Sequence, residues 1–182
     1  MSGEPPPGVP GELDPVTRGE LDPVTRGEQA IARVREALER AGLGDRVRTY
    51  PASTATSEQA AQAVGCRVSQ IAKSVVFRAG ERACLVVAPG DRRVSAAKLR
   101  AALGSKVSVA TAEFVLGCTG FEPGGVSPLG HQGALRVMID AALLQEPAVW
   151  IAAGSRWSVA RLSPQELIAL SGGQVLDLSE GG

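Results

Sequence analysis

One lysine stands apart from the other basic residues because of the residues around it. Lys73 follows Ile71 and Ala72 and comes immediately before the apolar run SVVF, 74–77. In such a position the methylene stem can lie along apolar surface while the ammonium reaches a cleft. A lysine that extends to solvent at the mouth of a strand would have the same sequence. Lys73 is therefore a candidate site residue, and the sequence pattern leaves both interpretations open.

A second feature is the segment GCTGFEPGGVSPLGH, residues 117–131, which holds five glycines and two prolines. Glycine and proline are common in ordinary turns. Where side chains are missing, main-chain N–H groups can also approach a ligand closely and form the wall of a pocket. The apolar residues Phe121, Val126 and Leu129 argue against a disordered linker. Composition by itself leaves turn and pocket as equal alternatives.

The chain has few of the histidine and cysteine residues that build common metal and catalytic sites. His131 is the only histidine, which argues against histidine-based metal sites and against Ser-His-Asp catalysis. The cysteines, Cys66, Cys84 and Cys118, are odd in number and outside any CxxC pattern, so neither a disulfide framework nor a zinc site is expected. We expect them to be small buried residues, and we expect no metal or cofactor.

The composition favours one folded domain preceded by an extension. The chain has 182 residues, of which 44% are hydrophobic, and no apolar stretch long enough to span a membrane. Residues 1–26 contain a tandem copy of GELDPVTR and few apolar residues, so we predict a disordered extension followed by a domain over 27–182. That domain carries 17 Lys and Arg against 14 Asp and Glu, a balance of +3 that permits contact with a phosphate backbone. A cytoplasmic protein is expected, because the acidic, proline-rich start is unlike a signal peptide.

The hydrophobic pattern predicts short helices and strands that interleave. Helices are expected over 28–41 and 58–64, after caps at Ser95 and Thr111, and after Ser163, where Pro164 and Glu166 complete the start signal. One helical turn is expected just before the strand at 74–77. Further strands are expected over 46–50, 83–88, 106–110, 135–140, 148–154, 157–162 and 174–178. The hairpin-length connections make the sheet mixed, and the fold class is mixed α/β.

Five segments carry a resemblance to a known family. They are PASTAT (51–56), QIAKSVVF (70–77), GFEPGGVSPLG (120–130), RVMIDAALLQEPAVWIAAGS (136–155) and LSPQEL (162–167). This combination resembles the YbaK/ProX family of aminoacyl-tRNA deacylases, which are similar to the editing domain inserted in bacterial prolyl-tRNA synthetases. The resemblance implies a single compact domain with a curved, mixed, largely antiparallel sheet surrounded by helices. It also implies hydrolysis, in trans, of the ester that joins a wrong amino acid to the 3′ end of a tRNA.

The resemblance implies a set of site residues. Lys73 matches the central site residue of the family, and we assign it a positioning and electrostatic role rather than that of a general base. The glycine segment 124–130 matches part of the pocket floor, and the main-chain N–H groups of Gly124 and Gly125 are expected to stabilise the negative charge that develops on the ester carbonyl oxygen. Substrate-binding roles are expected for Tyr50, Ser53, Thr54, Ser74, Pro128, Gly130, Asp140 and Ser155.

Some of these residues also have a purely structural interpretation. Asp140 could cap the AALL segment that follows it, and Ser53 and Thr54 could be ordinary turn residues. Some family members have asparagine after the lysine and a histidine in the segment SRWSVARL, where this chain has Ser74 and Trp157-Ser158. The resemblance therefore leaves open which amino acid is removed.

Three functions are compatible with these observations. The first is a free-standing hydrolase that edits aminoacyl-tRNA at its acceptor end, with prolyl-tRNA synthetase or another synthetase as a further partner. The second is a non-catalytic module that binds an aminoacyl or nucleotide group and docks on a synthetase or on the translation machinery. The third is a metabolic hydrolase of a small ester. The presence of both Lys73 and the GGVSPLG segment favours the first, and oligomeric state is not fixed by the sequence.

Overall fold

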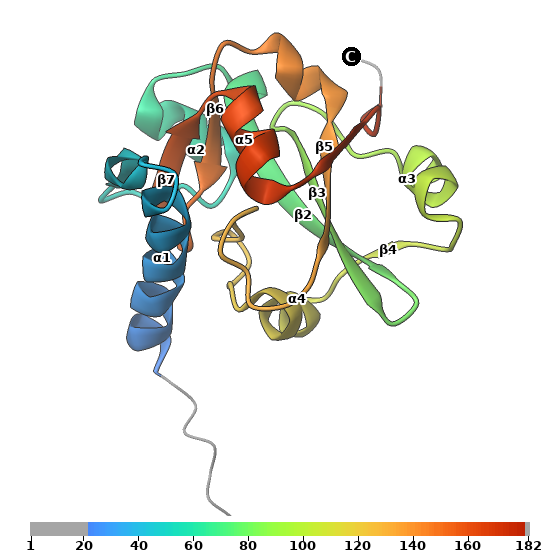
Figure 1. Ribbon diagram of the computed structural model, residues 1–182, viewed down its shortest axis with the longest axis horizontal. Helices are drawn as coiled ribbons and strands as arrows, with labels where there is room; N and C mark the ends of the chain where they lie inside the picture. The colour runs from blue at the N-terminus through green and yellow to red at the C-terminus, as the bar shows by residue number, and fades with distance from the viewer. Residues whose placement is uncertain (1–21, 181–182) are drawn as a thin grey trace, which may run out of the picture.

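The computed structural model describes residues 22–180, and within them one mixed sheet of eight strands forms the centre of the fold. Seven strands follow one another in the order β1 (Val47–Thr49), β7 (Ser158–Leu162), β6 (Val149–Ala152), β2 (Ile71–Ala79), β3 (Arg82–Pro89), β5 (Arg136–Asp140) and β8 (Gln174–Leu176). The two-residue strand β4 (Ser108–Val109) pairs with β2 outside this path. Parallel pairs join β2 to β6, β3 to β5 and β5 to β8, and the other pairs are antiparallel. The mixed α/β domain expected from the sequence is confirmed (Figure 1).

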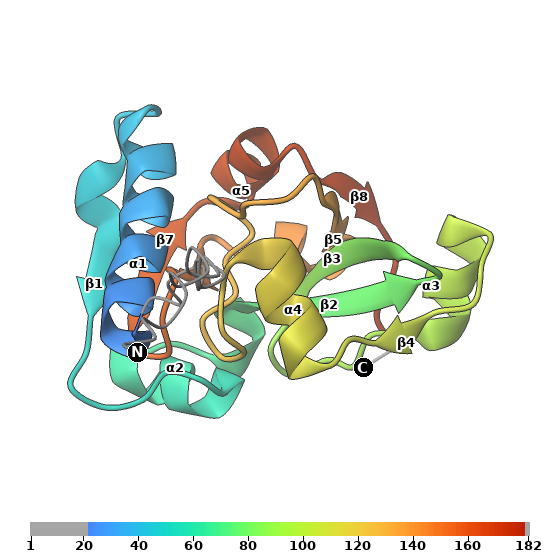
Figure 2. The ribbon, with the colours of Figure 1, turned by 90° about the horizontal axis from the view of Figure 1, so that it is seen from below.

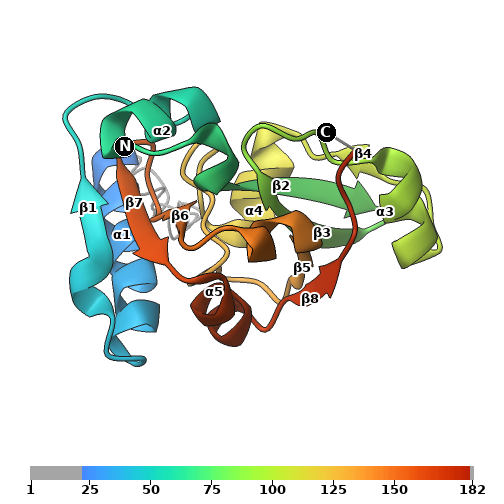
Figure 3. The ribbon, with the colours of Figure 1, turned by 90° about the horizontal axis from the view of Figure 1, so that it is seen from above.

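Five α-helices and three short 3₁₀ helices surround the sheet in the described part of the chain. The α-helices are α1 (Pro23–Glu39), α2 (Ser57–Val64), α3 (Ala96–Leu103), α4 (Ala112–Thr119) and α5 (Pro164–Ser171). The 3₁₀ helices are η1 (Gly44–Arg46), η2 (Val68–Gln70) and η3 (Ala141–Gln145). Helices α1 and α3 lie at opposite ends of the molecule in all three views, with the β2–β3 hairpin between them (Figures 1, 2 and 3).

The short helices begin where their capping residues predict. The side chains of Ser95, Thr111 and Ser163 each accept a hydrogen bond from a backbone N–H of the first turn. Pro164 takes the first position of α5, and Glu166 completes its capping box. These helices have only eight residues each, too few for stability on their own, so the caps fix where they start and tertiary packing holds them.

Helix α1 begins earlier than the sequence pattern predicted. Asp22 is its N-cap and accepts hydrogen bonds from the N–H groups of Val24 (3.0 Å) and Thr25 (3.1 Å), while Pro23 occupies the first helical position. The expectation that residues 22–26 belong to a disordered extension is therefore wrong. An Asp-Pro pair is itself a helix start, which the polar composition of the segment concealed. Residues 1–21 of the predicted extension lie outside the described residues.

Strand β2 also begins earlier than expected. A helical turn was predicted up to Lys73, but the 3₁₀ turn ends at Gln70 and the strand runs from Ile71 to Ala79. Pairing with both β3 and β6 draws residues 71–73 into the sheet. Lys73 therefore lies within a strand rather than at its mouth. In the opposite sense, the strand expected over 106–110 shrinks to Ser108–Val109.

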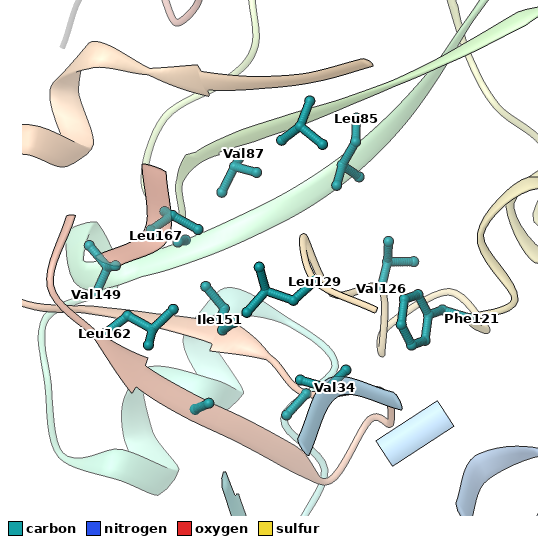
Figure 4. Close-up of a cluster of buried hydrophobic side chains, with 14 of the residues drawn as sticks. Val34, Leu85, Val87, Phe121, Val126, Leu129, Val149, Ile151, Leu162 and Leu167 are labelled. Carbon is teal, nitrogen blue, oxygen red and sulfur yellow. The ribbon is translucent and has the colours of Figure 1, made fainter. Parts of the chain in front are cut away.

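The main core lies between α1, the sheet and the glycine-rich segment. Val34 of α1, Ile151 of β6 and Leu162 of β7 meet Phe121, Val126 and Leu129 of the segment in one cluster of buried side chains (Figure 4). Phe121 is fully buried and Leu129 is 2% exposed. The glycine-rich segment is thus a folded part of the core, which fixes the position of the glycines between its apolar residues.

The cysteines carry free thiols, and only Cys84 is buried, whereas Cys66 and Cys118 are half-buried. The expectation of three buried cysteines is therefore correct for one of them. Burial raises the pKa of the Cys84 thiol. None of the helices within residues 22–180 combines the length and the apolar character needed to cross a membrane.

Candidate functional site

The site is built at a place where the central sheet is interrupted. Along one edge, β2 pairs with β6 only through Ile71 and Ala72, and with β4 only through Phe77 and Arg78. Residues 73–75 have no strand partner on this edge within the described chain. Successive side chains of a strand point to opposite faces of the sheet. Because no neighbouring strand of the described chain separates the two faces at residues 73–75, Lys73 and Ser74 can both border one space at this edge of β2.

That space is a cavity of about 100 Å³, which we call the Lys73 cavity. It is lined by Thr54, Ala55, Thr56, Ser57, Ala60, Ile71, Ala72, Lys73, Ser74, Gly124, Val126, Trp150, Ile151, Ala152 and Val159. The volume is well below the roughly 300–1,000 Å³ of pockets for drug-sized ligands, so it suits a small chemical group. Its described lining contains hydroxyl groups and one ammonium, but neither a carboxylate nor an imidazole.

The ammonium of Lys73 is held by the turn that follows β3. Its Nζ donates hydrogen bonds to the carbonyl oxygens of Gly90 (3.3 Å) and Arg92. A lysine ammonium has three donors, so one N–H remains for a bound group. Burial lowers the pKa of Lys73, Arg93 acts in the same direction, and the carboxylates of Asp91 and Glu58 partly oppose the shift. The two carbonyl oxygens therefore fix the orientation of the Lys73 ammonium, and the nearby carboxylates neutralise its positive charge only in part. Such an ammonium can bind a polar or anionic group.

Ser74 adds a free hydroxyl to the cavity. Its Oγ is buried and has no hydrogen-bond partner within the described residues. A buried hydroxyl without a partner costs about 1–3 kcal/mol, so its retention beside the lysine needs a reason. A substrate that enters the Lys73 cavity can supply the missing partner.

Gly124 contributes backbone rather than a side chain. Its φ is +90°, and a Cβ at this position would lie 3.0 Å from the Cβ of Ala55, which also lines the cavity. No described backbone or side-chain group accepts a hydrogen bond from the Gly124 N–H. The Gly125 N–H, by contrast, donates to the carbonyl oxygen of Glu122 (3.0 Å). Of the two predicted main-chain donors, only Gly124 lines the cavity with an unoccupied N–H.

The family model for the aminoacyl-tRNA editing domain matches residues 51–170, which include every residue that lines the Lys73 cavity. The chain belongs to the aminoacyl-tRNA editing domain family. This confirms the resemblance drawn from the sequence motifs.

Relatives of this editing-domain protein occur both as curated sequences and as solved structures. YwhH of Bacillus subtilis, an uncharacterized protein, is 40% identical over 126 residues, which are 69% of this chain and 80% of YwhH. EbsC of Enterococcus faecalis, named as a candidate Cys-tRNA(Pro)/Cys-tRNA(Cys) deacylase, is 28% identical over 68% of this chain and 77% of its own. A solved structure, described as a candidate trans-editing enzyme for prolyl-tRNA synthetase, is 42% identical with a TM-score of 0.78, over 89% of this chain and all of that one.

The editing domain does not gather all of the predicted site residues in the cavity. Lys73, Ser74, Thr54 and Gly124 line it. Those that do not are Tyr50, Ser53, Gly125, Pro128, Gly130, Asp140 and Ser155. Within this second group, Ser53 and Gly125 are chain neighbours of the lining residues Thr54 and Gly124. Ser155 lines a smaller cavity together with Gly125, and the Tyr50 N–H donates to the carbonyl oxygen of Trp157 (2.8 Å). The remaining three have positions that explain them structurally.

Gly130 and Asp140 have clear structural roles. The carbonyl oxygen of Gly130 accepts from Arg33 Nε (3.0 Å), and a Cβ on Gly130 would lie 2.9 Å from the Arg33 backbone, so this glycine allows α1 to approach the segment. Asp140 is 1% exposed. Its carboxylate accepts from the N–H groups of Ala142 (2.9 Å), Leu178 (2.8 Å) and Ser179 (2.6 Å). The capping interpretation of Asp140 is therefore the correct one. Pro128 is buried in the same segment as Gly130.

Several residues of the cavity were missed in the sequence analysis. Val126, Trp150 and Ala152 line it although they read as ordinary core or strand residues. The carbonyl partners of Lys73 come from the turn at 90–92, whose sequence GDR follows the apolar strand β3. The sequence did contain a signal for these partners. The turn at 90–92 directly follows β3, and the antiparallel pairing of β3 with β2 places the end of β3 opposite the start of β2, where Lys73 lies.

Proposed function

We propose that this editing-domain protein hydrolyses the ester between a mischarged amino acid and the 3′ end of a tRNA, in trans, in the Lys73 cavity. The observation that carries the proposal is the interruption of the sheet at residues 73–75. Beside this gap, three residues line one small space: Lys73 with its fixed ammonium, Ser74 with its free hydroxyl, and Gly124, whose N–H has no partner among the described residues. Family membership supports a deacylase role for that arrangement.

In this proposal each group has a separate task. The third N–H of Lys73 binds an oxygen of the terminal nucleotide and so positions the ester. The Gly124 N–H stabilises the negative charge that develops on the ester carbonyl oxygen. The Ser74 hydroxyl makes a hydrogen bond to the aminoacyl group that replaces its missing partner. Thr54 is committed to the fold, because its N–H (2.5 Å) and its hydroxyl (3.0 Å) both donate to the carbonyl oxygen of Arg156.

The attacking water is activated by the substrate rather than by the protein. The described lining of the Lys73 cavity holds no carboxylate or imidazole that could act as general base. The water oxygen bonds to the carbonyl carbon and gives up a proton, the bond from that carbon to the ribose oxygen breaks, and the departing ribose oxygen takes up the proton that the water has lost. Lys73 remains an ammonium throughout, consistent with its two carbonyl partners.

The size of the cavity and the relatives narrow the substrate. A volume of about 100 Å³ favours small amino acids such as cysteine, alanine, serine or threonine. The name of EbsC specifies cysteine attached to tRNA(Pro) or to tRNA(Cys) as its substrate. The solved relative is described as a candidate trans-editing enzyme for prolyl-tRNA synthetase. We therefore place tRNA(Pro) first among the tRNAs to test and prolyl-tRNA synthetase first among the partners.

The proposal is tested with a panel of aminoacyl-tRNAs that carry cysteine, alanine, serine or threonine. We expect at least one species to be deacylated faster than in buffer, and Lys73→Ala to lose that activity. Lys98→Ala is the matched control, because Lys98 lies on α3, outside the cavity, and its ammonium is paired with the carboxylate of Asp177 (2.7 Å). If no species is deacylated, or if Lys73→Ala is fully active, the catalytic proposal fails. Retained binding of aminoacyl-tRNA in the absence of any hydrolysis would favour the non-catalytic module.

A further inference from the structure

An exposed aromatic side chain lies beside the Lys73 cavity, in the turn between β6 and β7. Trp157 is 47% exposed, and the guanidinium carbon of Arg156 lies 5.8 Å from the centroid of a Trp157 ring. An exposed aromatic ring at a fixed position offers a face on which an unpaired nucleobase can stack. We call these two residues the Arg156–Trp157 shelf.

Hydrogen bonds hold the turn of the shelf in place. The Trp157 N–H donates to Ser155 Oγ (3.2 Å), and the Ser155 hydroxyl donates to Ser158 Oγ (3.0 Å). The hydroxyls of Ser158 and Thr49 share a further hydrogen bond of 3.0 Å. On the other side, the carbonyl oxygen of Trp157 accepts from the Tyr50 N–H (2.8 Å). A turn anchored to both β1 and β7 can present an aromatic ring with little loss of entropy on binding.

The shelf begins at the rim of the Lys73 cavity. Thr54, which lines the cavity, binds the Arg156 carbonyl oxygen through both its N–H and its hydroxyl. Gly124 also lines the cavity, and a Cβ there would lie 3.7 Å from Arg156 Cβ. The next residue, Gly125, lines a smaller cavity of about 50 Å³ together with both residues of the shelf. One glycine pair therefore separates the two spaces.

The charge of the shelf suits an anionic partner. No carboxylate within the described residues forms an ion pair with Arg156. The smaller cavity also contains Arg26 and one acid, Glu122, which are paired with each other at 3.4 Å. The local charge is thus set by Arg156, directly over an aromatic face.

We infer that the Arg156–Trp157 shelf binds the unpaired 3′ end of the tRNA, with a nucleobase stacked on Trp157 and a neighbouring phosphate at Arg156. The inference rests on the proposed function, because the ester is attached to the ribose of the last nucleotide. An ester that occupies the Lys73 cavity must therefore leave its nucleotide at the rim, where the shelf lies. Aromatic stacking and a nearby arginine are the usual means of binding single-stranded RNA without reading its sequence.

The test combines kinetics with the fluorescence of the two tryptophans. Replacing Trp157 with leucine keeps an apolar side chain but removes the stacking surface, whereas Trp157→Tyr retains it. Loss of one stacked base corresponds to roughly a 5- to 150-fold weaker affinity. We expect Trp157→Leu to raise KM for aminoacyl-tRNA by an amount in this range with a smaller change in kcat, and Trp157→Tyr to restore most of it. Arg156→Ala raises KM as well, whereas the exposed Arg100→Ala on α3 leaves it unchanged.

A direct binding experiment uses a short RNA oligonucleotide that ends in CCA. We expect it to quench tryptophan fluorescence in the wild type and in Trp150→Phe, where Trp157 is the remaining tryptophan. The quenching should be absent from Trp157→Tyr. Quenching without deacylation of any aminoacyl-tRNA would support the shelf and reject the proposed function. Lys73-dependent deacylation with an unchanged KM in Trp157→Leu and no quenching would overturn the shelf and leave the proposed function intact.

Discussion

Replacing Ser74 with alanine should make the protein more stable and less active. The Ser74 hydroxyl is buried without a partner among residues 22–180, at a cost of about 1–3 kcal/mol that alanine does not incur. We expect a gain near the lower end, about 1 kcal/mol, because the cavity beside Ser74 allows some relaxation. For a chain of this size, that gain raises Tm by roughly 2–4 °C. The lost hydrogen bond to substrate should lower kcat/KM by roughly 2- to 10-fold.

The matched control is Ser127→Ala. Ser127 is also fully buried, but its Oγ accepts a hydrogen bond from the Leu129 N–H (3.1 Å). Its replacement leaves that N–H without a partner, so we expect a loss of about 1–3 kcal/mol. Urea unfolding of both variants, followed by circular dichroism, gives the two free energies. If Ser74→Ala loses as much stability as Ser127→Ala, the Ser74 hydroxyl has a partner in the folded protein and the reasoning about the site is wrong.

Three further predictions follow from the same contacts. If Lys73 acts as an ammonium, kcat/KM falls as the pH rises through its lowered pKa, whereas a general base would give a rate that rises over the same interval. Gly125→Ala places a Cβ 2.7 Å from Ser155 Cα and should lower the free energy of unfolding in urea by roughly 1–3 kcal/mol. Gly117→Ala lies inside α4, where a Cβ would meet no described atom within 4 Å outside the backbone of its own helix turn, and it should raise the free energy of unfolding by about 0.5–1 kcal/mol. Asp140→Ala removes the acceptor of three backbone N–H groups and should cost roughly 3 kcal/mol or more without changing kcat at temperatures where the variant is folded.

Each of these predictions has a result that contradicts it. A pH profile of kcat/KM that rises with pH, after subtraction of the rate in buffer, would make Lys73 a general base. Equal stability of the two glycine variants would mean that the close approach of Gly125 to the Ser155 turn does not constrain the fold. If the Asp140→Ala variant is fully folded and its kcat is reduced, Asp140 takes part in substrate binding as the sequence resemblance implied.

The parts of the fold that depend on neighbouring residues were predictable from sequence. The starts of α3, α4 and α5 follow from the side chains of Ser95, Thr111 and Ser163, each of which accepts a hydrogen bond from the N–H group three residues further along the chain. The β2–β3 hairpin follows from two apolar runs around a short turn. Asp22-Pro23 is a start signal of the same local kind, and it was missed because the surrounding repeat has the composition of a disordered segment.

The site depended on pairing between distant residues and could be predicted only in part. Lys73 and Ser74 were named from a motif, but their access to one cavity depends on where β6 and β4 stop pairing with β2. No local pattern marks that gap. The glycine-rich segment serves the fold and the site together. Its apolar residues Phe121, Val126 and Leu129 pack in the core. Gly130 allows the close approach of α1, and Gly124 lines the Lys73 cavity. Composition could not separate these tasks, because each requires a small residue or an apolar one.

The role of Lys73 is tested most directly by single-turnover deacylation of the preferred aminoacyl-tRNA, with the protein in excess. Wild type, Lys73→Ala and Lys98→Ala are compared at one pH, and the rate in buffer is subtracted. We predict that Lys98→Ala matches the wild type and that Lys73→Ala falls to the buffer rate while its Tm stays close to that of the wild type. A Lys73→Ala variant that deacylates at the wild-type rate would contradict the assignment of the Lys73 cavity as the site of ester hydrolysis.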